Sequence, residues 1–314
     1  MDTITCTASP SLALTKYWGK NEKGLPATGS FAVTLGGLET RTAVSLSDRD
    51  SITINGEEQD ISSFLPFFGR VRDISRKDLH FEVSSVNTFP TAAGIASSSS
   101  GYAALAYGCT KAAGMELSYK ELSRIAGTGS VSASRAVFGG FVLLPEGAEH
   151  ARQMFGPDYW PQIRILVAVV DEKAKKISSR EAMEISKKSS PYYPAWLTSS
   201  RVLVLKAAIA LEGRDLEALG EIMRTSYLRM HAAMMAGVPS VRYWQPASLV
   251  VQDACADLRK RGIGAWETMD AGPQVKIVCT AEDSAAVRAE LESRLPGIKI
   301  LESYPGREVR LVDA

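Results

Sequence analysis

The sequence has little of several residue types that mark particular classes of protein. Its four cysteines are far apart and form no C-x-x-C pair, so neither a disulfide scaffold nor a zinc ribbon is expected. Three histidines are too few for a histidine-rich metal site. Lysine and arginine number 36 against 35 acidic residues, and the net charge of +1 favours neither nucleic acid nor an anionic membrane as a partner.

Long hydrophobic runs are also missing. The longest, such as ILVAVV at 165–170, fall far short of the roughly 20 apolar residues that span a bilayer. The first 20 residues contain no basic leader followed by a long apolar core. We therefore expect a cytoplasmic protein with no membrane partner. Its 45% hydrophobic and 23% charged residues are typical of a globular protein, and 314 residues favour two domains.

Hydrophobic patterns predict a mixture of strands and helices. The first half contains apparent neighbouring strands at 30–38 and 40–46, then a third at 51–56 that ends in an Asn-Gly turn. The second half is more helical, with helices at 201–213 and 215–237. Apolar residues on the longer helix recur every three or four positions, which indicates core packing. The pattern predicts an α+β fold whose domains cover 1–165 and 166–314.

A run of four serines stands where a loop is expected to become a helix. In PTAAGIASSSSGY (90–102), small residues and Ser97 to Ser100 precede a helical pattern. Serine hydroxyls cap helix starts, and the free N–H groups of a first turn suit a bound phosphate. The stretch is therefore either a phosphate-binding loop or a serine-rich cap only.

Three other stretches carry polar residues that a fold does not require: LTKYWGK (14–20), GSVSASR (129–135) and ETMDAGPQVKI (267–277). Each is either a solvated edge or turn, or part of a site in which lysines and an arginine bind anions and Asp270 acts as a base. Together with the serine loop they suit phosphoryl transfer from a nucleotide to a hydroxyl of an anionic substrate. No Walker A motif and no G-x-S-x-G occurs, so a serine hydrolase is a weak rival.

These stretches resemble the diphosphomevalonate decarboxylases of the GHMP kinase superfamily. The resemblance rests on KYWGK (16–20), FPTAAGIASSSSGYAAL (89–105), GSVSASRAVFGGF (129–141), KISSREAM (176–183), SPYYPAW (190–196) and MDAGPQVKI (269–277). It implies an N-terminal domain like ribosomal protein S5 domain 2 and a ferredoxin-like C-terminal domain. It also implies ATP, Mg²⁺, a homodimer, and decarboxylation of mevalonate 5-diphosphate to isopentenyl diphosphate in isoprenoid biosynthesis.

The resemblance also implies roles for individual residues. Asp270 would accept the proton of the 3-hydroxyl, Lys16 would stabilise charge beside it, and Arg135 would bind the carboxylate. The implied nucleotide-binding residues are Asn87, Ala93, Gly94, Ser97, Ser98 and Ser99, with Ser98 also near the metal. The implied substrate-binding residues are Tyr17, Lys20, Ser130, Ser132, Arg135, Ser179 and Arg180, and Lys20, Ser179 and Arg180 would lie at the 5-phosphate end.

Four positions depart from the family pattern: Ser11 and Gln274 replace asparagine, Thr28 stands where asparagine is frequent, and Val131 replaces a glycine. None is a proposed catalytic residue, although Val131 is a candidate for reshaping the substrate pocket. The alternatives are the same reaction on mevalonate 5-phosphate, a kinase that phosphorylates the 3-hydroxyl without decarboxylation, and a catalytically silent ATP-binding module.

Overall fold

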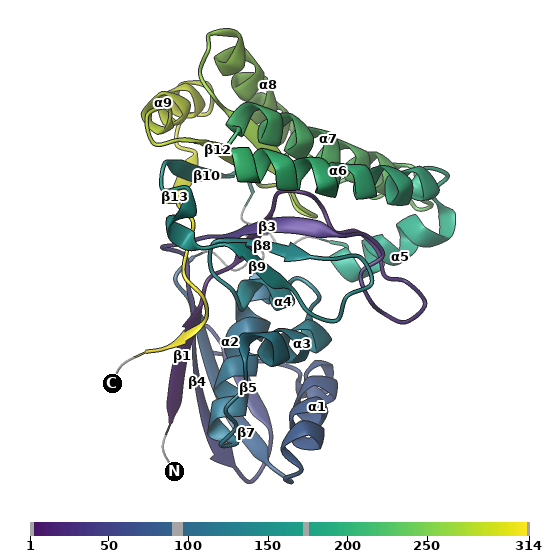
Figure 1. The fold of residues 1–314 in the computed structure, drawn as a ribbon, viewed down its shortest axis with the longest axis vertical. Helices are drawn as coiled ribbons and strands as arrows, with labels where there is room; N and C mark the ends of the chain where they lie inside the picture. The colour runs from purple at the N-terminus through teal and green to yellow at the C-terminus, as the bar shows by residue number, and fades with distance from the viewer. Residues whose placement is uncertain (1–2, 90–96, 172–175, 313–314) are drawn as a thin grey trace.

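Three sheets organise the chain in the computed structural model, which describes residues 3–89, 97–171 and 176–312 (Figure 1). The strands are β1 (Ile4–Ala8), β2 (Ser11–Ala13), β3 (Ser30–Thr34), β4 (Thr40–Ser47), β5 (Ser51–Ile54), β6 (Glu57–Glu58), β7 (His80–Asn87), β8 (Phe141–Leu144), β9 (Arg152–Phe155), β10 (Ile163–Val169), β11 (Trp266–Met269), β12 (Val275–Thr280), β13 (Lys299–Ser303) and β14 (Arg310–Leu311). The α-helices are α1 (Leu65–Ser75), α2 (Ser97–Ala112), α3 (Tyr119–Gly129), α4 (Ala133–Ala136), α5 (Ser179–Ser189), α6 (Tyr193–Gly213), α7 (Leu216–Met235), α8 (Pro246–Lys260) and α9 (Ser284–Arg294). The predicted α+β fold is confirmed.

The first sheet has six strands in the order β14-β1-β4-β7-β5-β6, and α2 packs against β1 and β4. The predicted Asn-Gly turn is confirmed, because Asn55 and Gly56 join β5 to β6 with φ of +52° and +83°. Aromatic side chains fill the space between this sheet and its helices, with Phe68 stacked on Phe81.

The second sheet, in the order β2-β3-β8-β9, corrects the prediction that residues 30–38 and 40–46 form neighbouring strands. β3 belongs to this second sheet, whereas β4 lies in the first. All five residues of β3 are buried, because the strand lies in a middle layer between α4 and α6 (Figure 1). Gly36 and Gly37 connect the two sheets, and Gly37 has a φ of +78°.

The third sheet has the order β11-β12-β10-β13, with every neighbouring pair antiparallel. Two helical crossovers, one through α5 to α8 and one through α9, connect its strands in the ferredoxin-like manner that the resemblance implied. The predicted core stripe of α7 is confirmed, since Leu219, Met223, Tyr227, Met230 and Met234 are all buried.

Helix α6 begins eight residues before the predicted start at 201, with Pro194 in its first turn. Residues Tyr193 to Glu212, with a mean hydropathy of 1.2, are long and apolar enough to cross a membrane, although the sequence there has no long uninterrupted apolar run. However, Leu203, Ala207 and Leu211 are buried in the largest core cluster. One face of α6 therefore packs in the core.

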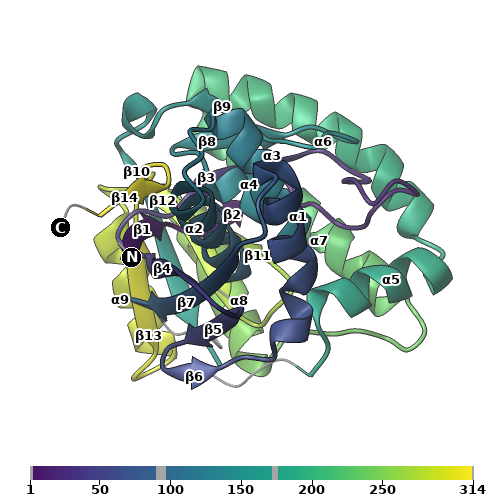
Figure 2. The ribbon, with the colours of Figure 1, turned by 90° about the horizontal axis from the view of Figure 1, so that it is seen from below.

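The C-terminal segment returns to the first sheet after β13. β14 pairs with β1, with Cys6 opposite Leu311, and the two chain ends lie on the same side of the molecule (Figure 2). Val309 of this segment is fully buried in the core of the first sheet. Residues from both ends of the chain thus complete one sheet.

Candidate active site

A cavity of about 1080 Å³ brings together most of the residues singled out in the sequence. Segments from both halves of the chain line it, and the predicted site residues among them are Lys16, Tyr17, Lys20, Ser97, Ser98, Ser130, Ser132, Arg135, Ser179, Arg180 and Asp270. The charged lining residues are four cations and two carboxylates, the second being Glu184. The cavity is therefore net positive and suits an anionic ligand.

An ion-pair cluster occupies the deepest part of this site. The Nζ of Lys16 lies 2.7 Å from Oδ1 of Asp270, and the Nζ of Lys276 lies 3.2 Å from Oδ2 of the same carboxylate. Both lysine side chains are 1% exposed, whereas that of Asp270 is 24% exposed toward the cavity. Two buried lysines thus hold the Asp270 carboxylate, which remains accessible from the cavity.

Electrostatic coupling changes the ionisation of this cluster. Burial alone would raise the pKa of Asp270, but the two lysines outweigh it and hold that pKa well below its usual range. Burial lowers the pKa of Lys16 from 10.5 to about 8, although its attraction to Asp270 opposes the shift. Asp270 is therefore ionised at neutral pH, and Lys16 loses its proton only in mildly alkaline solution.

Backbone contacts hold the segment that carries Lys16. After β2, the N–H of Leu14 donates to the carbonyl of Phe31, and the N–H of Lys16 donates to Oγ of Ser226 on α7. The Lys16 Nζ also donates to the carbonyl of Ala13 at 2.7 Å. The lysine is thereby fixed at both its backbone and its tip.

The glycine in KYWGK permits a close approach between two of the quoted stretches. Gly19 has a φ of +100°, and a Cβ at this position would lie 1.9 Å from the Tyr193 hydroxyl of SPYYPAW. Trp18 is tied to the same region, because its Nε1 donates to Ser186 and its carbonyl accepts from Trp196. These contacts fasten KYWGK, which lines the cavity, to the SPYYPAW stretch behind it.

Arg135 is buried on the short helix α4 and has an unused donor. One terminal nitrogen of its guanidinium donates to Oγ of Ser30 at 2.5 Å, but its Nε has no hydrogen-bond partner among the described residues. The Tyr17 hydroxyl and the Ser11 Oγ are likewise buried without partners in that part of the chain. Burial lowers the pKa of Arg135 to about 10, so it remains charged at neutral pH. Unpaired polar groups around a charged guanidinium suit a carboxylate or phosphate ligand.

Another part of the cavity lining is less buried and also carries cations. Lys20, Ser179 and Arg180 line it, and the latter two belong to the first turn of α5. Ser178 caps this helix by accepting from the N–H of Glu181. A helix start with nearby cations is a favourable place for a phosphate group.

The structure does not bring every predicted nucleotide-binding residue to the cavity. Ser99 is fully buried, and its hydroxyl accepts from the N–H of Ser11. Asn87 lies at the end of β7, where its side-chain oxygen accepts from Thr40. Ala93 and Gly94 lie outside the described residues. Ser97 and Ser98 line the cavity at the start of α2.

The four departures from the family pattern have different surroundings. Ser11 and Val131 line the cavity. Thr28 is buried, and its hydroxyl accepts from the N–H of Trp18. Gln274 is also buried and fastens the Asp270 loop to the end of β10, because its Oε1 accepts from the N–H of Val170 and its Nε2 donates to the carbonyl of Asp171.

Sequence reasoning missed two residues of the buried cluster. Lys276 looks like an ordinary strand residue in the sequence. Because nearly all of β12 is buried, the hydrophobic pattern does not show that the Lys276 side chain faces a carboxylate. His231 lies on α7 beneath Lys16, Asp270 and Lys276, and burial lowers its pKa to about 3, so the imidazole is neutral. Lys276 lies within the quoted stretch MDAGPQVKI, whereas no quoted stretch contains His231.

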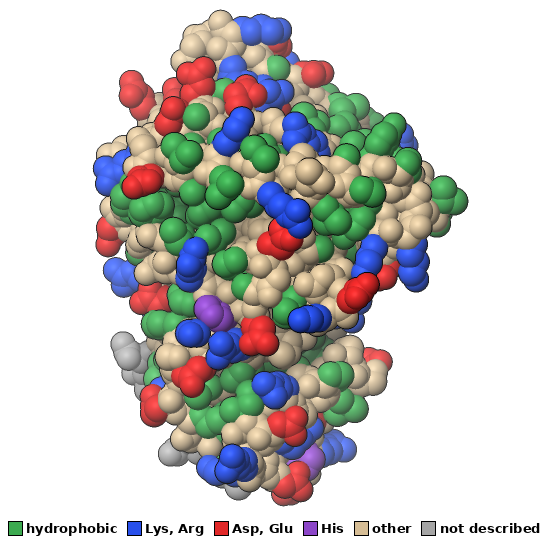
Figure 3. Space-filling view, turned by 45° about the vertical axis from the view of Figure 1, so that its right-hand side comes forward, with side chains coloured by type: hydrophobic (Ala, Val, Ile, Leu, Met, Phe, Trp, Pro, Cys, Tyr) green, Lys and Arg blue, Asp and Glu red, His purple; other side chains and the backbone are tan. Residues whose placement is uncertain are grey.

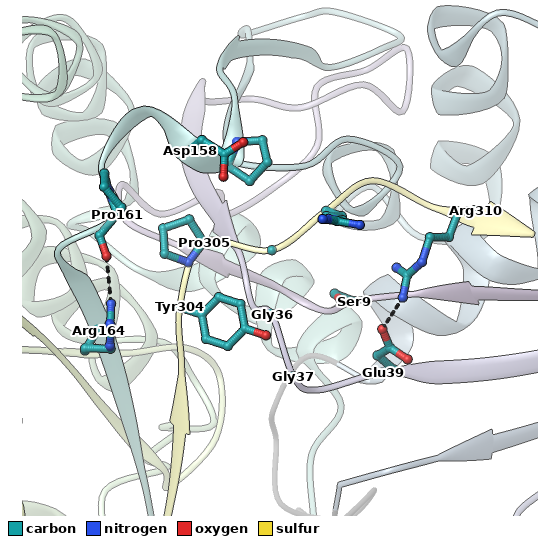
Figure 4. Close-up of a pocket in the computed structure, with 13 residues that line it drawn as sticks. Ser9, Gly36, Gly37, Glu39, Asp158, Pro161, Arg164, Tyr304, Pro305 and Arg310 are labelled. Carbon is teal, nitrogen blue, oxygen red and sulfur yellow. Dashed lines mark hydrogen bonds and ion pairs between the residues drawn. The ribbon is translucent and has the colours of Figure 1, made fainter. Parts of the chain in front are cut away.

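A second cavity of about 580 Å³ lies away from this site (Figure 4). It is formed by the loop after β3, the segment before β10 and the C-terminal segment, with Tyr304 at its centre. Arg310 pairs with Glu39 at 2.7 Å, and Arg164 donates to the carbonyl of Pro161. Two of its cations are thus already engaged, and none of the predicted site residues that the structure describes lines it.

Comparison with known proteins identifies the family. The model of the diphosphomevalonate decarboxylase-like N-terminal domain matches residues 8–154, and that of the mevalonate 5-diphosphate decarboxylase C-terminal domain matches residues 165–311. The chain belongs to the diphosphomevalonate decarboxylase family. A diphosphomevalonate decarboxylase of Bos taurus is 31% identical over 99% of this chain and 86% of its own.

Solved structures agree with this assignment. The mevalonate diphosphate decarboxylase of Staphylococcus aureus superposes with a TM-score of 0.94 at 31% identity, over 99% of this chain and 98% of its own. The enzyme of Enterococcus faecalis gives 0.91 at 31% identity over the whole of both chains. A further chain, named MDDEF and solved with MVAPP, AMPPCP and magnesium, gives 0.92 at 31% identity over the whole of both.

Proposed function

We propose that this protein catalyses the ATP-dependent decarboxylation of mevalonate 5-diphosphate to isopentenyl diphosphate. The observation that carries the proposal is the accessible Asp270 carboxylate, clamped by Lys16, in the same cavity as the buried Arg135 with its unpaired Nε. A hydroxy acid bound between them would present its hydroxyl to Asp270 and its carboxylate to Arg135.

The chemistry follows from this arrangement. A tertiary hydroxide is a poor leaving group, and ATP supplies the phosphoryl group that makes it a good one. The 3-oxygen attacks the γ-phosphorus, its proton passes to Asp270, and ADP leaves. The C3–O bond then breaks and releases phosphate, while the C1–C2 electron pair forms the C2=C3 double bond and releases CO₂.

Asp270 contributes mainly by orienting the 3-hydroxyl for attack, and its strength as a base matters less. A carboxylate with a depressed pKa is a weak base, but phosphoryl transfer passes through a loose transition state that needs little early proton removal. Lys16 and Arg135 offset the charge that develops on the substrate oxygens. Arg135 also binds the substrate carboxylate until C3 becomes electron-deficient. The C1–C2 electron pair then moves toward C3, and CO₂ is released.

The two phosphate-bearing ligands would occupy different parts of the site. We assign the 5-diphosphate to Lys20, Ser179, Arg180 and the first turn of α5, and the nucleotide phosphates to Ser97 and Ser98 at the start of α2. Mg²⁺ usually keeps several waters and binds through phosphates with few protein ligands. The Ser98 hydroxyl is exposed at the cavity edge and fits such a ligand. Within the described ranges, no group of three or more His, Cys, Asp or Glu residues could hold a metal ion.

The test offers purified protein ATP and Mg²⁺ with mevalonate, its 5-phosphate or its 5-diphosphate, and follows ADP and CO₂ together. We expect equal release of both from the diphosphate alone. Equal release from the monophosphate would move the substrate and leave the mechanism intact. ADP without CO₂ would make the protein a kinase, and nucleotide binding without ADP formation would make it a silent module.

We also infer that the chain forms a homodimer through α6. Val202, Leu205 and Ile209 are 52%, 68% and 71% exposed and follow the alternating spacing of three and four that a helix seam requires. Hydrophobic side chains gather on the upper part of the molecule, where α6 and α7 lie (Figure 3). A two-fold axis across α6 would place this stripe against its own copy.

Light scattering after size exclusion tests the homodimer. We expect twice the chain mass of 33.9 kDa for the unaltered protein and a shift toward one chain for Leu205→Glu. The control is Leu249→Glu, which changes an exposed leucine on α8 and leaves the mass unchanged. A single-chain mass for the unaltered protein at micromolar concentration would end this inference.

Two coarser expectations accompany these proposals. We propose that the chain divides near residue 165 into an N-terminal and a C-terminal domain, which the separate matches of the two family models support. We also propose a cytoplasmic location, testable by fractionation of the source cells with an antibody to the protein.

A further inference from the structure

Lys276 is a buried charge that cannot reach the substrate itself. It lies on the central strand β12, opposite Val167 of β10 and Thr268 of β11, and its side chain is 1% exposed. It is absent from the residues that line the main cavity, whereas Asp270 is among them. Lys276 can therefore influence the reaction through the charged groups beside it, of which Asp270 is in direct contact.

The number of charges in the cluster exceeds what a structural ion pair needs. Lys16 alone would neutralise Asp270, yet Lys276 adds a second lysine at 3.2 Å and Arg135 adds a third buried cation nearby. Burying excess charge is expensive unless something compensates for it. An anionic substrate would compensate for it, and this suits a site that must bind a carboxylate next to a phosphoryl group.

We propose that Lys276 is a positioning residue, which fixes Oδ2 of Asp270 so that the carboxylate keeps one orientation toward the bound substrate. The proposal rests on the function proposed above. Because Lys16 occupies Oδ1 and Lys276 occupies Oδ2, the carboxylate cannot rotate without losing an ion pair. The 3-hydroxyl would therefore always meet the same exposed face of Asp270.

Four groups on different elements determine the charge state of Asp270. Lys16 follows β2, Lys276 lies on β12, Arg135 lies on α4, and the neutral His231 lies on α7. Loss of the Lys276 charge removes an attraction from Asp270 and a repulsion from Lys16. The pKa of both groups should then rise, so both limbs of the pH profile should move to higher pH.

The test compares Lys276→Met with the unaltered protein. We expect kcat to fall about 10- to 100-fold with KM changed less than about threefold, in the range of a lost orienting contact, and both pH limbs to move upward. Lys276→Arg should restore the limbs. The matched control is Thr268→Val, which alters the buried neighbour directly opposite Lys276 without changing charge, and should leave both limbs in place.

A second measurement does not depend on turnover. In protein with ¹³C-labelled aspartate carboxyls, the Asp270 resonance is assigned by its loss in Asp270→Asn and followed against pH. It should titrate at clearly higher pH in Lys276→Met than in the unaltered protein. An unchanged titration with unchanged pH limbs would overturn the proposal, as would equal shifts in Thr268→Val. If no mevalonate derivative is turned over, the proposed function fails while the resonance still decides the role of Lys276.

Discussion

The lining of the main cavity has a buried part, the inner end, and a less buried part, the outer end. Both carry cations, but the cations differ in their contacts. At the inner end, Lys16 and Lys276 hold Asp270 in direct ion pairs, and all three are tied to buried backbone or strands. At the outer end, Lys20 and Arg180 are partly or fully exposed, near the start of α5. The comparison teaches that the inner charges are organised before any ligand arrives, whereas the outer charges, as we propose, bind a ligand that brings its own charge.

The largest effect should come from the inner end. Asp270→Asn removes the proton acceptor and both ion pairs, so we expect kcat to fall about 10³-fold or more, in the range for a lost acid–base group. Nucleotide binding, measured by calorimetry, should change little. The control is Asp158→Asn in the second cavity, which should retain full activity. Near-normal turnover of Asp270→Asn would exclude Asp270 as the base.

The inner end should also set the alkaline limit of activity. Lys16 is charged only below its pKa, which burial lowers to about 8, so kcat/KM should fall above pH 8 by about tenfold per pH unit. Lys16→Arg should keep its charge and remove the limb up to about pH 10. A profile that stays flat to pH 10 in the unaltered protein would contradict the assignment.

The outer end should affect binding rather than turnover. Arg180→Gln removes one charged contact to the 5-diphosphate, so KM should rise about 10-fold while kcat stays within about twofold. The rise should shrink in high salt, because the residue is exposed. Lys188→Gln, in the last turn of the same helix, is the matched control and should leave KM unchanged. A fall in kcat instead would place Arg180 with the inner residues.

The smallest effect on kcat/KM should come from the support behind the inner end. Gln274→Ala removes hydrogen bonds to Val170 and Asp171, so we expect unfolding in urea to be easier by about 1–3 kcal/mol. Turnover should fall less than tenfold, because the lysine clamp remains. Gln162→Ala, at an exposed position before β10, serves as the control. A stability equal to that of the unaltered protein would show that the loop is held by other contacts.

The sequence predicted the site better than it predicted how the sheets are arranged. Motifs with unusual composition, such as KYWGK and DAGP, point to chemistry wherever they lie, and the structure brings them to one cavity. Strand assignment depends on local patterns, which do not say to which sheet a strand belongs. β3 and β4 both look like strands, but only long-range contacts place them in different sheets.

The serine run shows a related limit. Consecutive helical residues point about 100° apart, so neighbouring serines cannot share one environment. Ser98 is exposed at the cavity, whereas Ser99 is fully buried behind it. Lys276 shows another limit. It stands within the quoted MDAGPQVKI, but the sequence does not show that its side chain pairs with Asp270 of the preceding turn.

The return of the chain to β1 has a consequence for synthesis. The strand β1 is made first, but its outer edge is covered only by β14, and Val309 completes the core beneath it. During translation the first sheet therefore has an open edge until residues 305–311 have been made. An open edge invites pairing with other chains, so slow synthesis or truncation before residue 309 should make the nascent protein prone to aggregation even though every proposed catalytic residue is already present.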